Sequence, residues 1–336
     1  MPNADDSPEV ASFSQTTPTN QPITWTIVGC GAIGLLAAAR AALSGFPKVQ
    51  LALRQQATIG KVPASFAFSF CAGQQEYPIL LSTITTQTPI AALLIPVKAY
   101  SIVDTVKEYL PRLSADAQIV LCHNGMGTIE QVLPLLGEQQ GLWFASTTHG
   151  AYKSTPLRVV HSGQGNTILA ALNPAAKQHQ AAKQLANSSN DSSVVDAMDQ
   201  MLGPCEVVSD IMPFLWRKLA VNLVINSLTA IHNVRNGALA GTEYQSVMNQ
   251  LITEFLAVAA LAGQTFDPKQ LQLQIADVIA RTADNYSSML QDVTNGRKLE
   301  ADYISGFLLK LGQQHLLDLP TIAQINQALH SLASVR

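Results

Sequence analysis

One stretch of the chain places a lysine and two asparagines at intervals of four residues. Lys218, Asn222 and Asn226 stand among apolar neighbours. Four-residue spacing puts the three side chains on one face of a helix, with a drift of about 40° per step. Buried ammonium and amide groups without partners are costly, so a ligand or a neighbouring helix must satisfy them. The pattern favours a stripe that faces a ligand. The alternative is a lysine that extends to solvent, with amides bonded to an adjacent helix.

A glycine-rich turn is the second feature with chemical meaning. The segment Gly29–Gly34 reads Gly-Cys-Gly-Ala-Ile-Gly, follows the apolar run Ile23–Val28 and opens the Ala-rich segment Leu35–Leu43. In a strand-turn-helix unit the first glycine permits the tight turn, the second admits a pyrophosphate, and the third lets the helix pack closely. The helix start also offers free N–H groups to phosphates. The segment predicts dinucleotide binding, with an ordinary turn as the alternative.

The charge after the second apolar run bears on which dinucleotide is bound. NAD-binding proteins usually carry an acidic residue ~20 positions after the glycine turn. Here Arg54 takes that place, and no Asp or Glu occurs between Val49 and Gly60. A guanidinium can hold a 2′-phosphate with paired hydrogen bonds, whereas a carboxylate would repel it. NADP(H) is therefore the predicted cofactor, unless Arg54 is simply a solvated residue at a strand end.

Two polar residues follow later apolar runs. Lys98 comes directly after Ile90–Val97, and Asn124 comes shortly after Gln118–Cys122. Open α/β sheets bind ligands at the carboxyl ends of their strands. Either residue alone is as well explained by a plain loop, but together they would line one crevice.

Further polar residues of the C-terminal half have types that suit a binding site. They are Asn236, Asn285, Ser287, Ser288 and Glu300. Glu300 is expected to begin an amphipathic helix that ends near Leu311. Taken singly, these are ordinary cap and turn residues.

The elements that must position these groups follow from the hydrophobic pattern. From Ile23 to about Ala151, short apolar runs alternate with helix-length segments, as in parallel strands joined by crossover helices. The predicted strands are Ile23–Val28, Val49–Leu53, Ile90–Val97, Gln118–Cys122 and Leu142–Thr147. Beyond Ser209 the apolar residues recur at helical spacing. The predicted fold class is an α/β Rossmann-type dinucleotide-binding domain followed by an all-α domain.

A tail and two domains are expected. Residues 1–22 have no basic start and no apolar core, so they are not a secretory signal, and we expect a disordered tail. Residues 23–209 would form the NADP-binding domain, and residues 210–336 the helical domain for substrate and catalysis.

Three local predictions concern the region between the two domains. Arg158–Ala171 contains two glycines and is predicted to form an antiparallel hairpin that closes the first domain. Asn173–Ser193 is polar and is expected to be an exposed helix and loop. Asp210 is the expected N-cap of the next helix, with Pro213 in its opening turn.

The composition narrows the classes of function. The chain has 336 residues, of which 47% are apolar and 13% charged, so it should fold into about two globular domains. A formal charge of -3 argues against nucleic acid and anionic membranes as partners. The most hydrophobic late stretch, Ile211–Ile231, is interrupted by polar residues, so no membrane span is predicted. Four cysteines without a C-x-x-C pair predict neither a metal site nor a disulfide framework, and a cytoplasmic protein is expected.

With these residues in view, the chain strongly resembles the ketopantoate reductase (2-dehydropantoate 2-reductase) family from Ile23 to about Leu311. The segments that carry the resemblance are Gly29–Gly34, His123–Gly127, Leu215–Asn222 and Asn285–Asp292. The third is far more specific than the glycine turn. The resemblance implies reduction of 2-dehydropantoate to (R)-pantoate by NADPH, a step of pantothenate and coenzyme A synthesis. The chain departs from the family in its first 22 residues and in the polar stretch 177–193.

The resemblance also assigns roles to individual residues. Lys218 resembles the proton donor of the family, and Glu300 resembles the acid that meets ligand at the cleft between domains. The implied substrate-binding residues are Lys218, Asn222, Asn226, Asn236, Asn285, Ser287 and Ser288. The implied cofactor-binding residues are Gly29, Cys30, Gly31, Ala32, Ile33, Gly34, Arg54, Lys98, Asn124, Ala151 and Glu300. No metal is implied.

The chemistry expected of this set follows from charge. Hydride arriving at a ketone carbon leaves an alkoxide, which the Lys218 ammonium can protonate as it forms. Burial or a nearby Lys98 would lower the pKa of Lys218, whereas a substrate carboxylate or Glu300 would raise it. The expected partner is a small 2-ketoacid, and the protein would be either a monomer or a homodimer.

Two alternatives stand beside this interpretation. A non-catalytic NADP-responsive protein would need the phosphate cradle but no proton donor, so Lys218 and Glu300 argue against it. A reductase of another branched 2-ketoacid would share the fold and the donor, because neither defines the substrate side chain.

Overall fold

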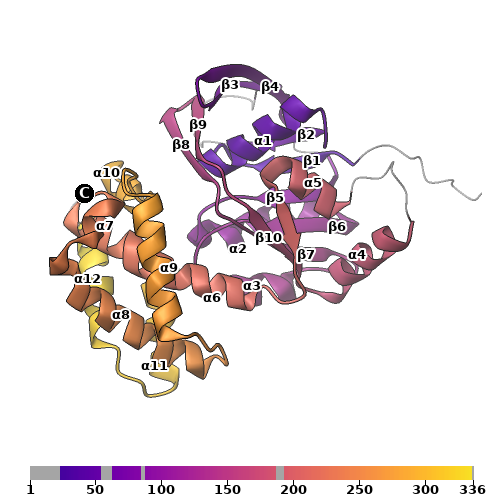
Figure 1. Cartoon of the computed structure of the whole chain (residues 1–336). Coiled ribbons are helices and arrows are strands. Elements are labelled where there is room, and N and C mark those ends of the chain that lie inside the picture. Colours follow the sequence, from indigo (N-terminus) through magenta and orange to yellow (C-terminus); the bar gives the residue numbers. More distant parts are fainter. Residues whose placement is uncertain (1–22, 54–62, 85–87, 187–192, 335–336) are drawn as a thin grey trace, which may run out of the picture.

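A seven-stranded sheet forms the centre of the N-terminal part of the chain (Figure 1). This computed structural model describes residues 23–53, 63–84, 88–186 and 193–334. The strands are β1 (Trp25–Val28), β2 (Val49–Ala52), β5 (Ile90–Ile95), β6 (Leu113–Leu121), β7 (Gly141–Thr147), β10 (Thr167–Ala171) and β11 (Cys205–Val207). Their order is β11-β10-β7-β6-β5-β1-β2. The five strands from β7 to β2 run parallel, and β10 runs antiparallel to β7.

Three connections between the parallel strands are helical, which confirms the predicted α/β class. Helix α1 (Ala32–Ser44) joins β1 to β2. The segments η1 (Ala99–Ser101), α2 (Ile102–Tyr109) and η2 (Leu110–Arg112) join β5 to β6, and α3 (Ile129–Val132) and η3 (Leu133–Leu135) join β6 to β7. All five predicted strands are present. The sheet order reverses between β1 and β5, and such a switch point is where doubly wound sheets bind ligands.

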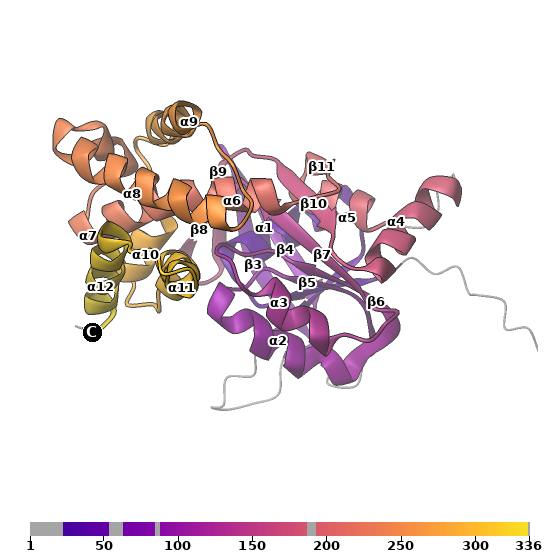
Figure 2. The ribbon, with the colours of Figure 1, turned by 90° about the horizontal axis from the view of Figure 1, so that it is seen from below.

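Alternate residues of each strand face opposite layers, so the sheet has an apolar core on both sides. Leu93 and Ile95 of β5 pack in the core that includes α2 and α3. Leu94, between them, packs in the core that includes α1. Figure 2 shows α2 and α3 together on the side of the sheet that faces away from α1.

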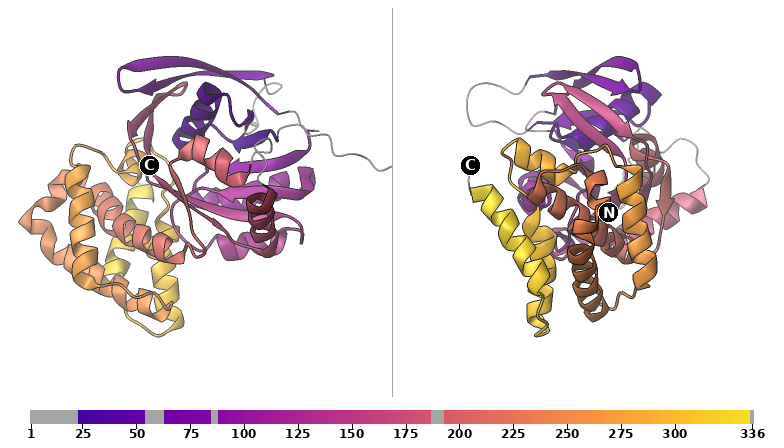
Figure 3. Two further views of the ribbon diagram at one scale, coloured as in Figure 1. Left: turned by 45° about the vertical axis from the view of Figure 1, so that its right-hand side comes forward. Right: turned by 60° about the vertical axis from the view of Figure 1, so that its left-hand side comes forward.

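A second, four-stranded sheet was not predicted. It consists of β3 (Ser65–Ala72), β4 (Gln75–Ser82), β8 (Gly150–Thr155) and β9 (Arg158–Gly163), in the order β4-β3-β9-β8. Figure 3 shows the indigo hairpin of β3 and β4 arching over α1. The sequence does contain its signal, because Phe66, Phe68 and Phe70 alternate with small residues and Gly73 lies in the two-residue turn.

The prediction of a hairpin over Arg158–Ala171 is wrong. The segment forms two strands, but they belong to different sheets: β9 pairs with β3 and β8, and β10 pairs with β7 and β11. Local alternation identifies a strand, whereas its partner depends on packing elsewhere in the fold. The glycines between the two strands therefore mark a passage between sheets rather than a tight turn.

The polar region that follows is partly helical, as expected. Helix α4 (Pro174–Ala186) begins it, and α5 (Val194–Leu202) follows, with the Ser193 hydroxyl accepting a bond from the Asp196 N–H at its N-cap. Residues 187–192 and the predicted tail 1–22 lie outside the described residues.

Beyond β11, the described residues form helices without strands, which confirms the all-α prediction. They are α6 (Met212–Val221), η4 (Asn222–Asn226), α7 (Ser227–His232), η5 (Asn236–Ala240), α8 (Thr242–Leu261), α9 (Pro268–Arg281), α10 (Ser288–Thr294), η6 (Ala301–Tyr303), α11 (Ser305–Gln314) and α12 (Pro320–Ser334). Helix α6 has Pro213 in its first turn, and the Met212 N–H donates to the Asp210 carboxylate at 2.9 Å.

Glu300 departs from the prediction in its local structure. It is buried and precedes the short η6, while the amphipathic helix begins only at Ser305 and ends at Gln314. Within the described ranges, no helix is long and apolar enough to cross a membrane. The same residues contain no cluster of metal-ligating side chains, and all four cysteines are free.

Candidate active site

The carboxyl end of β1 carries the glycine-rich turn at the point where the strand order reverses. Gly29 has a φ of +77°, which residues with a side chain rarely adopt. A Cβ atom on Gly34 would lie 3.0 Å from Cγ of Pro96, directly after β5, so glycine lets α1 approach the strand ends closely. The turn has the geometry that its sequence predicts.

The first turn of α1 is open to an anion. Its N-cap residue, Gly31, is exposed and provides no side-chain cap, and the turn contains no acidic residue. The free N–H groups at a helix N-terminus carry a partial positive charge. These residues therefore fit the pyrophosphate of a dinucleotide.

Lys98 lies after β5 and contacts two carboxylates from the helical part. Its Nζ is 2.6 Å from Oδ2 of Asp292 and 3.2 Å from Oε2 of Glu300. The Ala99 N–H donates to the other oxygen of Glu300 at 3.0 Å. Burial by itself acts to lower the pKa of Lys98, but Glu300 and Asp292 together outweigh it, and the pKa lies above its ordinary value. Lys98 thus remains a cation that joins the two parts of the structure.

Lys218 extends from α6 to the end of β7. Its Nζ donates to the carbonyl oxygen of Thr147 at 2.8 Å. Burial lowers the pKa of Lys218, and the smaller opposing influences are the Cys122 thiol and Glu300. Cys122 follows β6, and burial raises its pKa to about 11. The ammonium therefore lies at the carboxyl ends of the central strands, close enough to Glu300 to interact with it electrostatically.

The helix that carries Lys218 changes its geometry where the two asparagines lie. At Asn222, α6 passes into the π-helical segment η4, which ends at Asn226 and continues as α7. A π turn holds more residues than an α turn, so a step of four residues falls short of a full turn instead of passing it. Within η4, each four-residue step therefore turns the side chain back, in the direction opposite to the drift predicted for a regular α-helix. Such π segments occur frequently at functional sites.

Two asparagines have buried polar atoms without a partner among the described residues. They are Nδ2 of Asn222 and Oδ1 of Asn236. Asn236 uses its other group, Nδ2, to donate to the Thr282 hydroxyl at 2.9 Å. An unsatisfied buried polar group costs ~1–3 kcal/mol, so both amides are suited to a ligand that completes their bonding.

The loop before α10 lies beside these amides. The Asn236 N–H donates to the Asn285 carbonyl at 3.0 Å, and α10 packs against η4. The side chains of Asn285 and Ser288 are exposed. The Ser287 hydroxyl is buried instead, where it accepts from the Leu290 N–H at 3.1 Å as the N-cap of α10. Ser287 therefore holds the helix that presents Ser288.

Asn124 lies on the loop after β6, and a histidine fixes the backbone of this loop. His123 Nδ1 is 2.8 Å from the Asn124 carbonyl oxygen, and its Nε2 is 2.8 Å from the Thr128 hydroxyl. Burial lowers the pKa of His123 to about 4, so the ring is neutral. A carbonyl can only accept, so Nδ1 carries the proton and Nε2 accepts from Thr128.

The structure brings most of the predicted residues into two adjoining groups. Lys98, Asn124, Lys218 and Glu300 gather around the carboxyl ends of the parallel strands, next to the glycine turn. The asparagines and serines of the helical part gather around η4. Ala151 lies on β8, beside α1. Arg54 lies outside the described residues.

Sequence reasoning missed two contributors to the first group. Asp292 stands within a segment that carries the family resemblance, two residues after the apolar pair Met289-Leu290, and an acid on the same helix as this buried pair was the available signal. Thr147 contributes its backbone carbonyl, which no sequence pattern could have identified.

Comparison with known proteins agrees with this arrangement along nearly the whole chain. Two models described as ketopantoate reductase PanE/ApbA match it. The first model matches residues 25–174, and the model of the C-terminal region matches residues 210–333.

Curated relatives also align with most of this chain. The chain is 34% identical over 260 residues to a 2-dehydropantoate 2-reductase of Vibrio cholerae, which is 77% of this chain and 83% of the relative. It is also 34% identical over 300 residues to that of Escherichia coli O157:H7, which is 88% of this chain and 90% of the relative.

Solved structures show the same fold. A ketopantoate reductase from Ralstonia eutropha superposes with a TM-score of 0.77 at 20% identity, over 93% of this chain and 99% of the other. D-mandelate dehydrogenase, solved with NADH and anilino(oxo)acetate, superposes with a TM-score of 0.78 at 20% identity over the same shares. At these identities the likeness concerns the fold alone.

Proposed function

This chain belongs to the ketopantoate reductase family, and we propose that it reduces the ketone of 2-dehydropantoate to (R)-pantoate with NADPH. It is an oxidoreductase of a family that uses nicotinamide dinucleotides. The observation that carries the proposal is the position of Lys218. Its ammonium lies 2.8 Å from the Thr147 carbonyl, at the strand ends where a Rossmann sheet holds its cofactor. The reaction would contribute to pantothenate and coenzyme A synthesis.

Lys218 supplies the acid chemistry in this proposal. NADPH, when bound, delivers a hydride to the ketone carbon. The carbonyl oxygen then gains negative charge, which the Lys218 ammonium stabilises and protonates. Because burial lowers the pKa of Lys218, the amine releases its proton more readily than a lysine in water.

The substrate is held by neutral polar groups. Asn222 and Asn236 offer the buried atoms that lack partners, and Ser288 offers an exposed hydroxyl nearby. Such groups bond a carboxylate, a carbonyl and a hydroxyl without adding a charge of their own near Lys218, whose pKa burial lowers. Asn226 and Asn285 complete the proposed substrate set.

On the cofactor side, Gly29–Gly34 would hold the pyrophosphate, and Arg54 the 2′-phosphate. Lys98, Asn124, Ala151 and Glu300 would line the remaining part of the dinucleotide site. The ion pairs between Lys98 and Glu300 place this lining at the junction of the two parts.

Replacement of Lys218 by alanine tests the proposal. We expect kcat for 2-dehydropantoate to fall by about 10²–10⁴-fold, because the proton donor is gone, while the Kd for NADPH changes little. In the wild type, kcat/KM should decline as pH rises through the pKa of Lys218 in the free enzyme, at a pH below the ordinary lysine value of 10.5.

Three results would count against the proposal. Full turnover by Lys218→Ala would remove the lysine from the reaction. NADPH binding without turnover of any 2-ketoacid would favour the non-catalytic alternative. A higher kcat/KM for 2-ketoisovalerate, which lacks the hydroxymethyl group, would instead assign another branched substrate.

A further inference from the structure

Lys153 is a cation held over the glycine-rich turn by the second sheet. It lies on β8, which packs beside α1 (Figure 1). Its Nζ donates to the carbonyl oxygen of Cys30 at 3.2 Å. Cys30 is the second residue of the turn, so an ammonium from a distant part of the chain lies directly at the predicted phosphate cradle.

The ammonium of Lys153 has N–H donors that remain available to bind an anion. It makes no ion pair within the part of the chain that the structure describes, and the Cys30 carbonyl occupies one of its three donor positions. Lys153 is partly buried, so its charge is less screened than that of a fully exposed lysine.

Where the structure describes the chain around the turn, the opening of α1 brings no negative side chain to Lys153. The first turn of α1 has no acidic residue, and Gly31 at its N-cap is exposed. The N–H groups that open α1 follow directly after Cys30, whose carbonyl the ammonium contacts, and their partial charges have the same sign as the ammonium. Both features select a phosphate group over a cation or a neutral ligand.

We propose that Lys153 binds the pyrophosphate of the dinucleotide, opposite the N–H groups of α1. This rests on the proposed function, because it takes the dinucleotide as the ligand of the turn. The pyrophosphate is favoured over the 2′-phosphate by position: Cys30 follows β1, whereas the 2′-phosphate is expected after β2, near Arg54. The second sheet is then part of the cofactor site rather than a cover for α1 alone.

Binding of NADPH and NADH to Lys153→Met, measured by calorimetry without substrate, tests this assignment. Both dinucleotides carry the pyrophosphate, so the Kd of each should rise by about tenfold, as for the loss of one bond to a charged group. Arg54→Asp is the contrasting variant, in which the Kd should rise for NADPH much more than for NADH. Lys107→Met, an exposed lysine on α2, is the matched control and should change neither value.

Three results would overturn the assignment. They are an unchanged Kd for both dinucleotides, a loss confined to NADPH, and a loss equalled by Lys107→Met. Lys153→Arg should restore most of the affinity, and this variant also serves if the methionine variant folds poorly. Failure of the wild type to bind NADPH would contradict the proposed function instead, so the two failures are distinguishable.

Discussion

Asp292 is a buried carboxylate with a cation at each oxygen. Oδ2 lies 2.6 Å from Nζ of Lys98, and Oδ1 lies 2.9 Å from Nε of Arg297. In Asp292→Asn, Lys98 keeps only Glu300 as its partner. We expect the free energy of unfolding, measured with urea, to fall by ~1–3 kcal/mol. The loss is smaller than for a fully buried pair because the Lys98 side chain is 34% exposed.

A matched variant separates this effect from a general loss of charge. Asp277→Asn removes a carboxylate from the exposed pair with Arg281 on α9. Exposed pairs contribute ~0–1 kcal/mol, so its effect should be much smaller. If both variants lower the free energy of unfolding equally, the contacts of Asp292 stabilise the fold no more than an exposed ion pair does.

His123 makes stability depend on pH. The pKa of the folded ring is about 4, below the ordinary 6.5, so between these values the unfolded chain binds a proton that the folded chain does not. The stabilisation that the neutral His123 ring gives to the fold is complete above about pH 6.5 and is lost as the pH falls toward 4. Over this range the free energy of unfolding changes by up to ~1.4 kcal/mol per pH unit. Urea midpoints of wild type and His123→Gln should therefore converge on acidification. Parallel curves would mean that folding leaves the pKa of His123 unchanged.

At the scale of elements, two neighbouring serines at the start of α10 have different roles. One stabilises the helix as its N-cap, and the other is exposed at its first position. Ser287 caps the helix and also accepts from the Thr229 hydroxyl at 2.7 Å, whereas Ser288 is exposed. Ser287→Ala should lower the free energy of unfolding by ~1 kcal/mol, as for other lost N-caps. Ser288→Ala should raise KM for 2-dehydropantoate and leave stability within ~0.5 kcal/mol. The reverse pattern would exchange the roles given to the two serines.

The elements that sequence predicted correctly are those whose neighbours in the chain are also neighbours in space. The strand at Ile90–Ile95 and the turn at Gly29–Gly34 belong to units whose helices follow directly, so local periodicity describes them well. The partners of β9 and β10 lie far away in the chain, and no local signal chooses between two sheets. The alternating phenylalanines of β3 were readable, but sequence reasoning assigned no element to residues 54–89.

The candidate site shows the same division. The stripe of Lys218 and two asparagines follows from spacing alone, because all three side chains lie on one continuous helix. The π geometry of η4 does not follow, since its extra residue per turn leaves no mark in the apolar pattern. Contacts such as that of Lys218 with Thr147, or Lys98 with Asp292, join residues far apart in sequence and required the structure.

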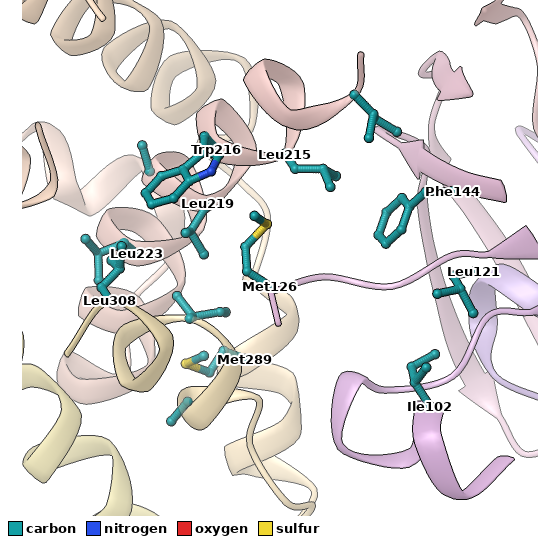
Figure 4. Close-up of a cluster of buried hydrophobic side chains, with 14 of the residues drawn as sticks. Ile102, Leu121, Met126, Phe144, Leu215, Trp216, Leu219, Leu223, Met289 and Leu308 are labelled. Carbon is teal, nitrogen blue, oxygen red and sulfur yellow. The ribbon is translucent and has the colours of Figure 1, made fainter. Parts of the chain in front are cut away.

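At the scale of the whole molecule, one apolar core extends from the sheet into the helical part. Figure 4 shows Phe144 and Leu121 of the sheet on one side of this core, Trp216 and Leu223 of the helical part on the other, and Met126 between them. Met126 is also tied to the helical part by its N–H, which donates to the Tyr303 carbonyl at 2.9 Å. The two parts therefore share apolar contacts that neither would retain alone.

This shared core predicts that the two parts unfold together. Calorimetry of the wild type should show one transition, with the calorimetric enthalpy close to the van't Hoff enthalpy. Met126→Ala should lower the free energy of unfolding of that single transition by ~2–5 kcal/mol. Two separate transitions, of which only one moves in the variant, would contradict a common core.

The second sheet also limits which substitutions the protein can accept during evolution. It encloses α1 from the side opposite the main sheet, so Leu35, Leu36, the three alanines that follow them and Ala41 are buried. A helix at the rim of a nucleotide-binding fold normally has an outer surface along its length on which substitutions drift freely, whereas the exposed residues of α1 are Ala42, Leu43 and Ser44 at its C-terminal end. In a library of single substitutions, Gly34–Ala39 should be as intolerant as a central strand, whereas the exposed residues Ala42, Leu43 and Ser44 should tolerate change. Lineages that shift their dinucleotide preference would then do so at the strand ends around it.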